Sequence, residues 1–222
     1  MSVAPIEQQA PFSPEVQRQL INWLSQPEGV DVELLGGQLR PKAMAKLRHG
    51  RAQMAISSQL FHMDALGVSA SDGEPPGSPI RWWLSLEVDI YIGGEGMRPD
   101  VAGWRLDRNP SPPPETNVAN HLGVITVVPD WVCEILSVST TGRDVGTTKD
   151  RGIKWKAYQR AGVEWYWIVD LEHESLTVYQ RTARSYEVVE MVGRGEVVRL
   201  PPFETVELSV TPLFLSDPKP SP

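Results

Sequence analysis

Two acidic residues lie where the pattern of side chains predicts the interior of a β-sheet. Glu134 is the one charged residue of the apolar run 131–136 (WVCEIL), and Asp100 precedes the predicted strand 101–105. A lone buried carboxylate is costly, so it is normally paired with a cation or bound to a metal. Carboxylate oxygens suit Mg²⁺ or Mn²⁺, which polarise a phosphoryl oxygen and lower the pKa of a bound water. The two acids therefore predict a divalent metal site suited to phosphoester hydrolysis.

A lysine is the natural third member of such a site, because it can orient the attacking water or offset charge in the transition state. The predicted helix 149–161 places Asp150, Lys154 and Tyr158 at intervals of four residues, roughly on one face. Lys154 is therefore the predicted catalytic lysine. The alternative is a solvated helix face, on which Asp150 and Lys154 form a surface ion pair worth roughly a few tenths of a kcal/mol.

Each acid also has a purely structural interpretation. Asp100 follows Pro99, and an aspartate in that position commonly caps a turn. Glu134 could form a buried ion pair with an arginine instead of binding a metal. Cys133 adjoins Glu134 on the predicted strand, so its side chain points to the opposite face and is expected in the core.

The elements around these residues predict an α/β fold. Ser13 and Pro14 are typical of a helix start, and Gly36-Gly37 between two apolar runs indicates a hairpin. The alternating segment 81–92 is predicted as a single strand, and a long helix is expected from about residue 41 to about residue 66. The further predicted elements are the strands 101–105, 131–136 and 166–170, the helix 149–161, and hairpins within 176–208.

Length and composition predict one folded domain. The chain has 222 residues, of which 41% are hydrophobic and 22% charged, and these values exclude wholesale disorder. We expect a flexible N-terminal arm at 1–12, a single domain at 13–215 and a Pro-rich tail at 216–222.

Charge and cysteine content limit the classes of function. The single cysteine excludes an internal disulfide framework and a cysteine-rich zinc site. No apolar run approaches the roughly 18 residues of a membrane helix, and the N-terminus has no secretory signal, so a cytoplasmic protein without a membrane partner is expected. The net charge of −7 has the wrong sign for holding nucleic acid by bulk charge, so DNA contact would need a local basic surface or metal ions.

Four stretches of the chain, in the same order, resemble the bacterial Uma-two family of restriction-endonuclease-like proteins, within the PD-(D/E)XK nuclease superfamily. They are 32–39 (VELLGGQL), 98–105 (RPDVAGWR), 129–140 (PDWVCEILSVST) and 150–170 (DRGIKWKAYQRAGVEWYWIVD), and the resemblance spans about residues 28–181. It implies a restriction-endonuclease-like domain with a mixed central β-sheet flanked by helices, often as a homodimer.

The resemblance also implies roles for individual residues. Asp100 matches the aspartate of the PD element and Glu134 the acid of the (D/E)XK element, so both would ligate the metal. The usual lysine, two positions after that acid, is replaced by Leu136. In this family the basic role moves to the following helix, which supports Lys154.

Two earlier residues match the family less specifically. Glu33 matches an early glutamate that would be an auxiliary metal ligand, and His49 matches a histidine of the next helix and is a weaker candidate. Gly36 and Val138 depart from the family's pattern, both at predicted turns.

The predicted function is therefore a Mg²⁺- or Mn²⁺-dependent endonuclease that hydrolyses DNA phosphodiester bonds by a metal-activated water. Glu33, Asp100 and Glu134 are the predicted metal ligands, and Asp100, Glu134 and Lys154 the predicted catalytic residues. Two alternatives stay open: a catalytically inactive nuclease fold that binds DNA or protein, and a hydrolase of another phosphoester.

Overall fold

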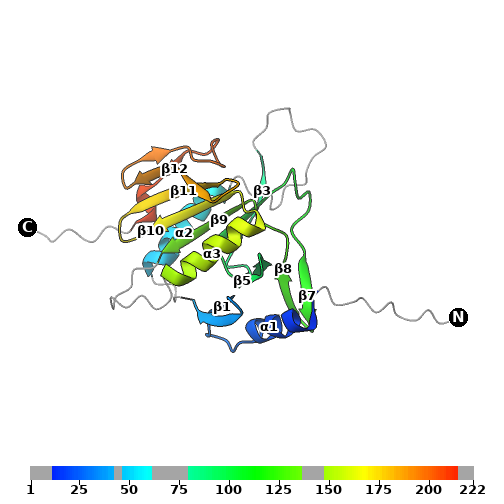
Figure 1. Cartoon of the computed structure of the whole chain (residues 1–222). Helices are drawn as coiled ribbons and strands as arrows, with labels where there is room; N and C mark the ends of the chain where they lie inside the picture. The colour runs from blue at the N-terminus through cyan, green and yellow to red at the C-terminus, as the bar shows by residue number, and fades with distance from the viewer. Residues whose placement is uncertain (1–11, 43–46, 62–79, 137–147, 215–222) are drawn as a thin grey trace, which may run out of the picture.

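The computed structural model describes residues 12–42, 47–61, 80–136 and 148–214 (Figure 1). The predicted arm at 1–12, apart from Phe12, and the predicted tail at 216–222 lie outside the described residues. No helix in the described ranges has the length and apolar character needed to cross a membrane.

A mixed sheet of six strands forms the centre of the molecule (Figure 1). Its strands, in spatial order, are β12 (Tyr186–Gly193), β11 (Ser175–Arg181), β10 (Trp165–Asp170), β9 (Trp131–Leu136), β6 (Val101–Arg105) and β3 (Trp82–Leu86). Strands β9 and β10 pair in parallel, and the other neighbours in this sheet pair antiparallel. We call this sheet the central sheet.

A second mixed sheet of six strands lies beside the central sheet. Its strands, in spatial order, are β2 (Gln38–Pro41), β1 (Val32–Leu35), β5 (Glu95–Met97), β4 (Ile90–Ile92), β8 (Leu122–Ile125) and β7 (Glu115–Ala119). A short pair, β13 (Val197–Val198) with β14 (Leu208–Ser209), and a 3-10 turn, η2 (Thr211–Leu213), complete the described elements.

Three helices in the described part of the chain cover these sheets. Helix α1 (Pro14–Leu24) is capped by Ser13 and packs Leu20 and Trp23 against the second sheet. Helix α2 (Leu47–Leu60) covers one face of the central sheet, where Ile56 shares a core cluster with Trp131. Helix α3 (Thr148–Ala161) lies on the opposite face, so the central sheet runs between α2 and α3 (Figure 1).

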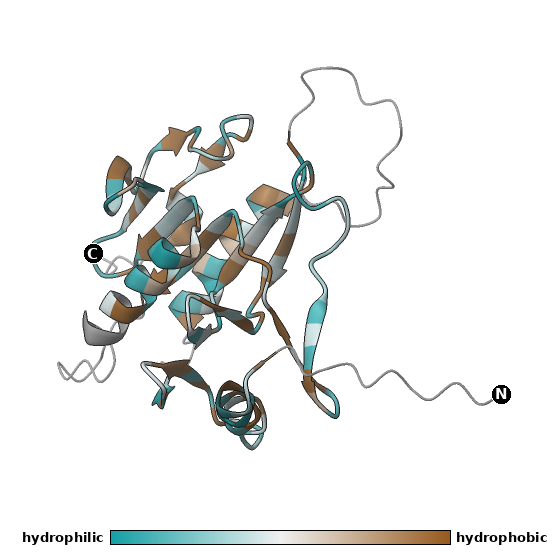
Figure 2. Cartoon of the chain, turned by 45° about the vertical axis from the view of Figure 1, so that its right-hand side comes forward, coloured by the Kyte–Doolittle hydropathy of each residue, from teal (hydrophilic) through white to brown (hydrophobic). Residues whose placement is uncertain are grey.

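The alternation of side chains along β9 decides which residues face α3. Trp131 and Cys133 belong to the core cluster on the α2 side, whereas Val132 belongs to the cluster that contains residues of α3. Glu134 shares the face of Val132 because successive strand residues point to opposite sides. The predicted burial of Cys133 in the core is confirmed, and Figure 2 shows hydrophobic segments among the strands at the centre of the molecule.

The mixed sheet flanked by helices is confirmed, but two predicted elements are wrong in extent. Segment 81–92 is two strands, because Glu87 takes a φ of 50° and the chain passes there from the central sheet to the second sheet. Each half still alternates against its own sheet, which is why the sequence looks like one strand. The predicted start of the second helix at about residue 41 is wrong, because Pro41 belongs to β2; residues 43–46 and 62–66 of that prediction lie outside the described residues.

The predicted hairpin around Gly36-Gly37 is confirmed as the β1–β2 turn, in which both glycines have positive φ values, 63° and 72°. Glycine adopts this left-handed conformation without a steric penalty, so both residues suit the turn. Val138, the other departure, lies outside the described residues.

Candidate active site

Asp100 and Glu134 lie on neighbouring strands of the central sheet. Val101 pairs with Cys133 in the antiparallel register of β6 and β9, and this register continued by one residue sets Asp100 beside Glu134. The Ile135 amide donates a hydrogen bond of 2.6 Å to Asp100 Oδ2, which fixes one oxygen of this carboxylate against β9.

Lys154 joins Glu134 to Glu33. Its Nζ lies 2.6 Å from Glu134 Oε1 and 2.9 Å from Glu33 Oε1. These three residues come from α3, β9 and β1, and all three are buried, with exposed fractions of 7%, 9% and 5%. Lys154 therefore faces a carboxylate cluster inside the protein and not a solvated helix face; the side chain of Asp150 lies outside the described residues.

Two further hydrogen bonds orient these carboxylates. The Tyr158 hydroxyl donates to Glu134 Oε1 at 2.7 Å, and the Arg98 backbone amide donates to Glu33 Oε1 at 2.9 Å. Tyr158 is one helical turn beyond Lys154, so both side chains reach the same glutamate. The ion pair of Glu134 is thus with a lysine, where the structural alternative had an arginine.

A second group of charged residues surrounds the other oxygen of Asp100. Its Oδ1 lies 3.2 Å from His49 Nε2 and 3.3 Å from Lys42 Nζ. The Lys42 ammonium also contacts Glu87 Oε2. The Gln53 amide donates to Glu87 Oε1 at 3.0 Å and to the Asp100 carbonyl at 2.8 Å, so it holds both acids in place.

The pKa values follow from burial and charge. Burial alone would lower the pKa of Lys154, but the carboxylates of Glu134 and Glu33 outweigh it and raise that pKa. Burial, together with Asp100 and Glu33, outweighs the attraction of Lys154 and raises the pKa of Glu134 to about 7. Lys154 is therefore a permanent cation, and Glu134 is a carboxyl group that can hold a proton near neutral pH.

The pKa of Asp100 shifts in the opposite direction. Burial would raise its pKa, but the contact with His49 and the charge of Lys42 outweigh burial and lower the pKa to about 2. Burial would lower the pKa values of Lys42 and His49, but Asp100 and Glu87 together outweigh it and raise both, and for His49 the hydrogen bond with Asp100 contributes as well. Asp100 is therefore ionised throughout the neutral range.

The donor set of this region fits a hard divalent cation. Carboxylate oxygens are the ligands that Mg²⁺ and Mn²⁺ prefer, and Asp100 Oδ1 is a buried carboxylate oxygen that already faces two basic side chains. Among groups of three or more His, Cys, Asp or Glu residues in the described ranges, only His49, Glu87 and Asp100 bring their ligand atoms within 4.8 Å of one another. Glu33, Asp100 and Glu134 are less tightly gathered, since Lys154 lies between the two glutamates.

The sequence prediction missed two charged residues of this region, Glu87 and Lys42. Glu87 occupies a polar position in the alternation of segment 81–92, so the sequence gives no sign of the bend there. Lys42 follows β2, and nothing in its local sequence distinguishes it from a surface lysine.

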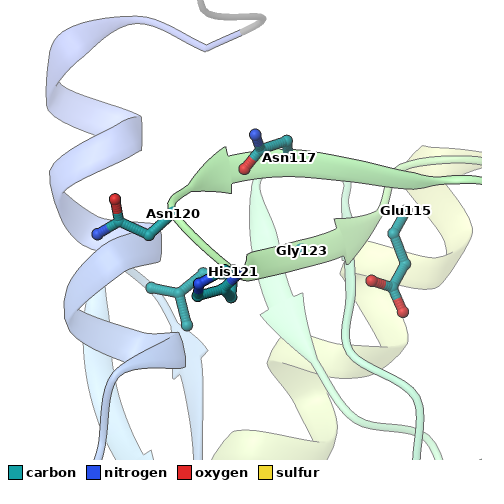
Figure 3. A pocket seen from close by; sticks show the side chains of 6 residues that line it. Glu115, Asn117, Asn120, His121 and Gly123 are labelled. Carbon is teal, nitrogen blue, oxygen red and sulfur yellow. The ribbon is translucent and has the colours of Figure 1, made fainter.

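A polar hollow on the β7–β8 hairpin contains none of these residues (Figure 3). It is lined by Glu115, Asn117, Asn120, His121, Leu122 and Gly123. In Figure 3 the side chains of Asn117 and Asn120 are well separated from the Glu115 carboxylate, so the hollow presents no convergent set of catalytic groups.

Comparisons with known proteins agree with the resemblance drawn from the sequence. The family model described as "Uma2: Putative restriction endonuclease" matches residues 17–211. A solved structure from Anabaena variabilis, described as "a putative nuclease belonging to DUF820", is similar with a TM-score of 0.59 and 20% identity, over 87% of this chain and 96% of that chain. At this identity the likeness shows the fold alone, and comparison with the curated proteins gives no match. Because the family model covers most of the chain, the protein belongs to the Uma2 family of restriction-endonuclease-like proteins.

Proposed function

We propose that this protein is a divalent-metal-dependent endonuclease that hydrolyses DNA phosphodiester bonds. Glu33, Asp100 and Glu134 would hold the metal, and Lys154 would act as the catalytic cation. The observation that carries the proposal is the buried contact of Lys154 Nζ with both Glu33 and Glu134, beside Asp100. The family's description as a restriction endonuclease supports DNA as the substrate.

The role of Lys154 follows from its charge. Its raised pKa keeps the ammonium protonated, so Lys154 donates hydrogen bonds and does not accept the proton of an attacking water. A buried cation in this position stabilises the negative charge that develops on the phosphoryl oxygens during hydrolysis.

The carboxylates have separate tasks. Asp100 is ionised at all neutral pH values and is suited to hold a cation permanently, whereas Glu134 can hold or release a proton near pH 7. Tyr158 and the Arg98 amide fix the Oε1 atoms of Glu134 and Glu33. A bound Mg²⁺ or Mn²⁺ would supply Lewis-acid polarisation of a phosphoryl oxygen and a water of lowered pKa.

Cleavage of supercoiled plasmid DNA tests this proposal. We expect nicked and linear products with Mg²⁺ or Mn²⁺ and none with EDTA, and we expect Glu134→Gln to slow cleavage by about 100-fold or more. The control is Glu187→Gln, an exposed glutamate of β12, which should cleave at the wild-type rate. Equal cleavage by wild type and Glu134→Gln, or cleavage without metal, would overturn the proposal.

The two alternative functions give different results. An inactive nuclease fold would bind DNA without cleaving it in any metal. A hydrolase of another phosphoester would cleave nucleotides or small phosphodiesters in preference to plasmid DNA. The homodimer and the cytoplasmic location stay predictions, and light scattering during gel filtration tests the dimer.

A further inference from the structure

We infer a second divalent-cation position, formed by His49, Glu87 and Asp100, at which the ammonium group of Lys42 competes with the ion for the carboxylate oxygens. This inference deepens the proposed function and rests on it, because Asp100 would be shared with the proposed catalytic metal site. The two positions differ in their other ligands: Glu33 and Glu134 in one, His49 and Glu87 in the other.

The geometry of these three residues is that of a site with ligands from separate elements. His49 comes from α2, Glu87 from the bend between β3 and β4, and Asp100 from the start of β6, and their ligand atoms all lie within 4.8 Å of one another. His49 and Asp100 are buried, while the Glu87 side chain is 36% exposed. An ion could therefore reach the position past Glu87.

Asp100 Oδ1 gives an independent indication of a cation position. This oxygen is buried and is contacted by basic side chains, whereas Oδ2 accepts a hydrogen bond from the Ile135 amide. A buried carboxylate is costly unless a cation faces it, so Oδ1 marks a place where this fold concentrates positive charge. The groups that face Oδ1 are Lys42 Nζ at 3.3 Å and His49 Nε2 at 3.2 Å.

The surroundings hold Glu87 and Asp100 in place before any ion binds. Glu87 has a φ of 50°, a conformation that residues other than glycine adopt rarely and at a cost. The Gln53 amide bonds both the Glu87 carboxylate and the Asp100 carbonyl. Such a supporting residue is what a preorganised ligand set needs, because it fixes the direction of the oxygens.

Lys42 supplies the ammonium group that competes with an ion at this position. Its ammonium contacts Glu87 and Asp100 Oδ1, so it balances part of their negative charge. A lysine ammonium is a point charge on a flexible four-carbon chain, without the fixed bidentate geometry of arginine. An incoming divalent cation would therefore displace the Lys42 ammonium from these oxygens and release the proton of His49 Nε2 to solvent, and Lys42 would weaken metal binding by competing for the same oxygens.

The donor types indicate which cation is preferred. One imidazole nitrogen with two carboxylates suits Mn²⁺ better than Mg²⁺, because Mg²⁺ strongly prefers oxygen ligands and imidazole binds transition metals. The position at Glu33 and Glu134 offers carboxylate oxygens, which suit Mg²⁺ and Mn²⁺ alike.

Mn²⁺ binding to the full chain, freed of metal with EDTA and then dialysed, tests the inference by the loss of the electron paramagnetic resonance signal of free Mn²⁺. We expect two equivalents in the wild type and one in His49→Gln and in Glu87→Gln. Lys42→Met should bind the second equivalent about tenfold more tightly than the wild type. The matched controls are His121→Gln and Lys156→Met, which should bind like the wild type.

Each outcome separates this inference from the proposed function. One equivalent in the wild type, unchanged by His49→Gln and Glu87→Gln but lost in Glu134→Gln, overturns the second position and leaves the proposed function standing. No Mn²⁺ binding in any variant overturns both. Should His49→Gln and Glu87→Gln fail to fold by circular dichroism, Lys42→Met decides, since unchanged affinity there contradicts displacement of the lysine.

Discussion

At the scale of single residues, Lys154 balances the charge of two buried glutamates. In the variant Lys154→Met, Glu33 and Glu134 face each other without the cation that contacts both. Loss of one partner from a buried ion pair typically destabilises a protein by about 3–5 kcal/mol, so we expect a loss near the lower end of this range in EDTA.

Urea unfolding with and without metal measures this loss. Millimolar Mg²⁺ should restore part of the stability of Lys154→Met and should also stabilise the wild type, because an ion that binds only the folded state favours it. Lys156→Met, an exposed lysine two residues along the same helix, is the control and should unfold like the wild type. A Lys154→Met variant as stable as this control would contradict the buried ion pairs.

The lowered pKa of Asp100 predicts a dependence of stability on acid. Its pKa is about 2 in the folded protein against 3.8 ordinarily, so the folded state is stabilised above pH 3.8 and loses this stabilisation as the pH falls to about 2. The difference corresponds to about 2 kcal/mol. Urea midpoints measured down this range should therefore fall less steeply in Asp100→Asn than in the wild type, and parallel curves would refute the assignment.

The sequence predicts those site residues whose burial follows from their own segment, and it misses those that only the tertiary structure brings to the site. Asp100 and Glu134 interrupt apolar segments, so their burial and its cost can be inferred locally. Lys42 and Glu87 reach the same region only because the chain bends at Glu87 and returns through another sheet. Their proximity to Asp100 depends on the tertiary structure, and no local sequence pattern predicts it.

At the scale of elements, the β4–β5 turn sets the position of α3. A Cβ atom at Gly93 would lie 2.7 Å from the Ala157 carbonyl oxygen, in the turn of α3 that follows Lys154. Gly93→Ala should therefore push the helix away from the second sheet, at a cost of about 1–3 kcal/mol in stability. Because Lys154 moves with the helix, we also expect slower plasmid cleavage.

Gly94→Ala is the matched comparison for this change. Gly94 also has a positive φ, 82°, but a Cβ atom there would meet nothing within 4 Å. Both variants thus carry backbone strain, and only Gly93→Ala carries the clash. Equal urea midpoints and equal cleavage rates for the two would show that the close approach to α3 has no effect.

The extent of the strands illustrates what the sequence could predict at this scale. Strands β6 and β9 and helix α3 were predicted within a residue or so, because each has a strong pattern and clear ends. The prediction of a single strand at 81–92 was wrong, because alternation indicates that one face of a strand is buried but does not indicate which sheet the strand belongs to. The break at Glu87 therefore has no counterpart in the hydrophobic pattern.

At the scale of the whole molecule, the net charge of −7 opposes the binding of DNA. We expect a dissociation constant weaker than about 10⁻⁵ M for a short duplex in EDTA at physiological salt, and binding at least about tenfold tighter with Ca²⁺. Fluorescence anisotropy of a labelled duplex measures both constants. Tight binding in EDTA would instead point to a basic surface and would favour a DNA-binding module without metal.

The overall architecture was predictable in class and not in detail. A mixed sheet with helices on both faces follows from the order of strands and helices along the chain. The second six-stranded sheet combines β1, β2, β4, β5, β7 and β8 from distant parts of the sequence. Which strands become neighbours there depends on long-range packing, so the sequence alone left that sheet unassigned.

A crystal soaked with MnCl₂ and measured near the manganese absorption edge tests the central claim most directly. The account predicts an anomalous peak among the carboxylate oxygens of Glu33, Asp100 and Glu134, at about 2.1 Å from its ligands. An ordered cluster without a peak, with Lys154 still bridging the two glutamates at millimolar Mn²⁺, would contradict it.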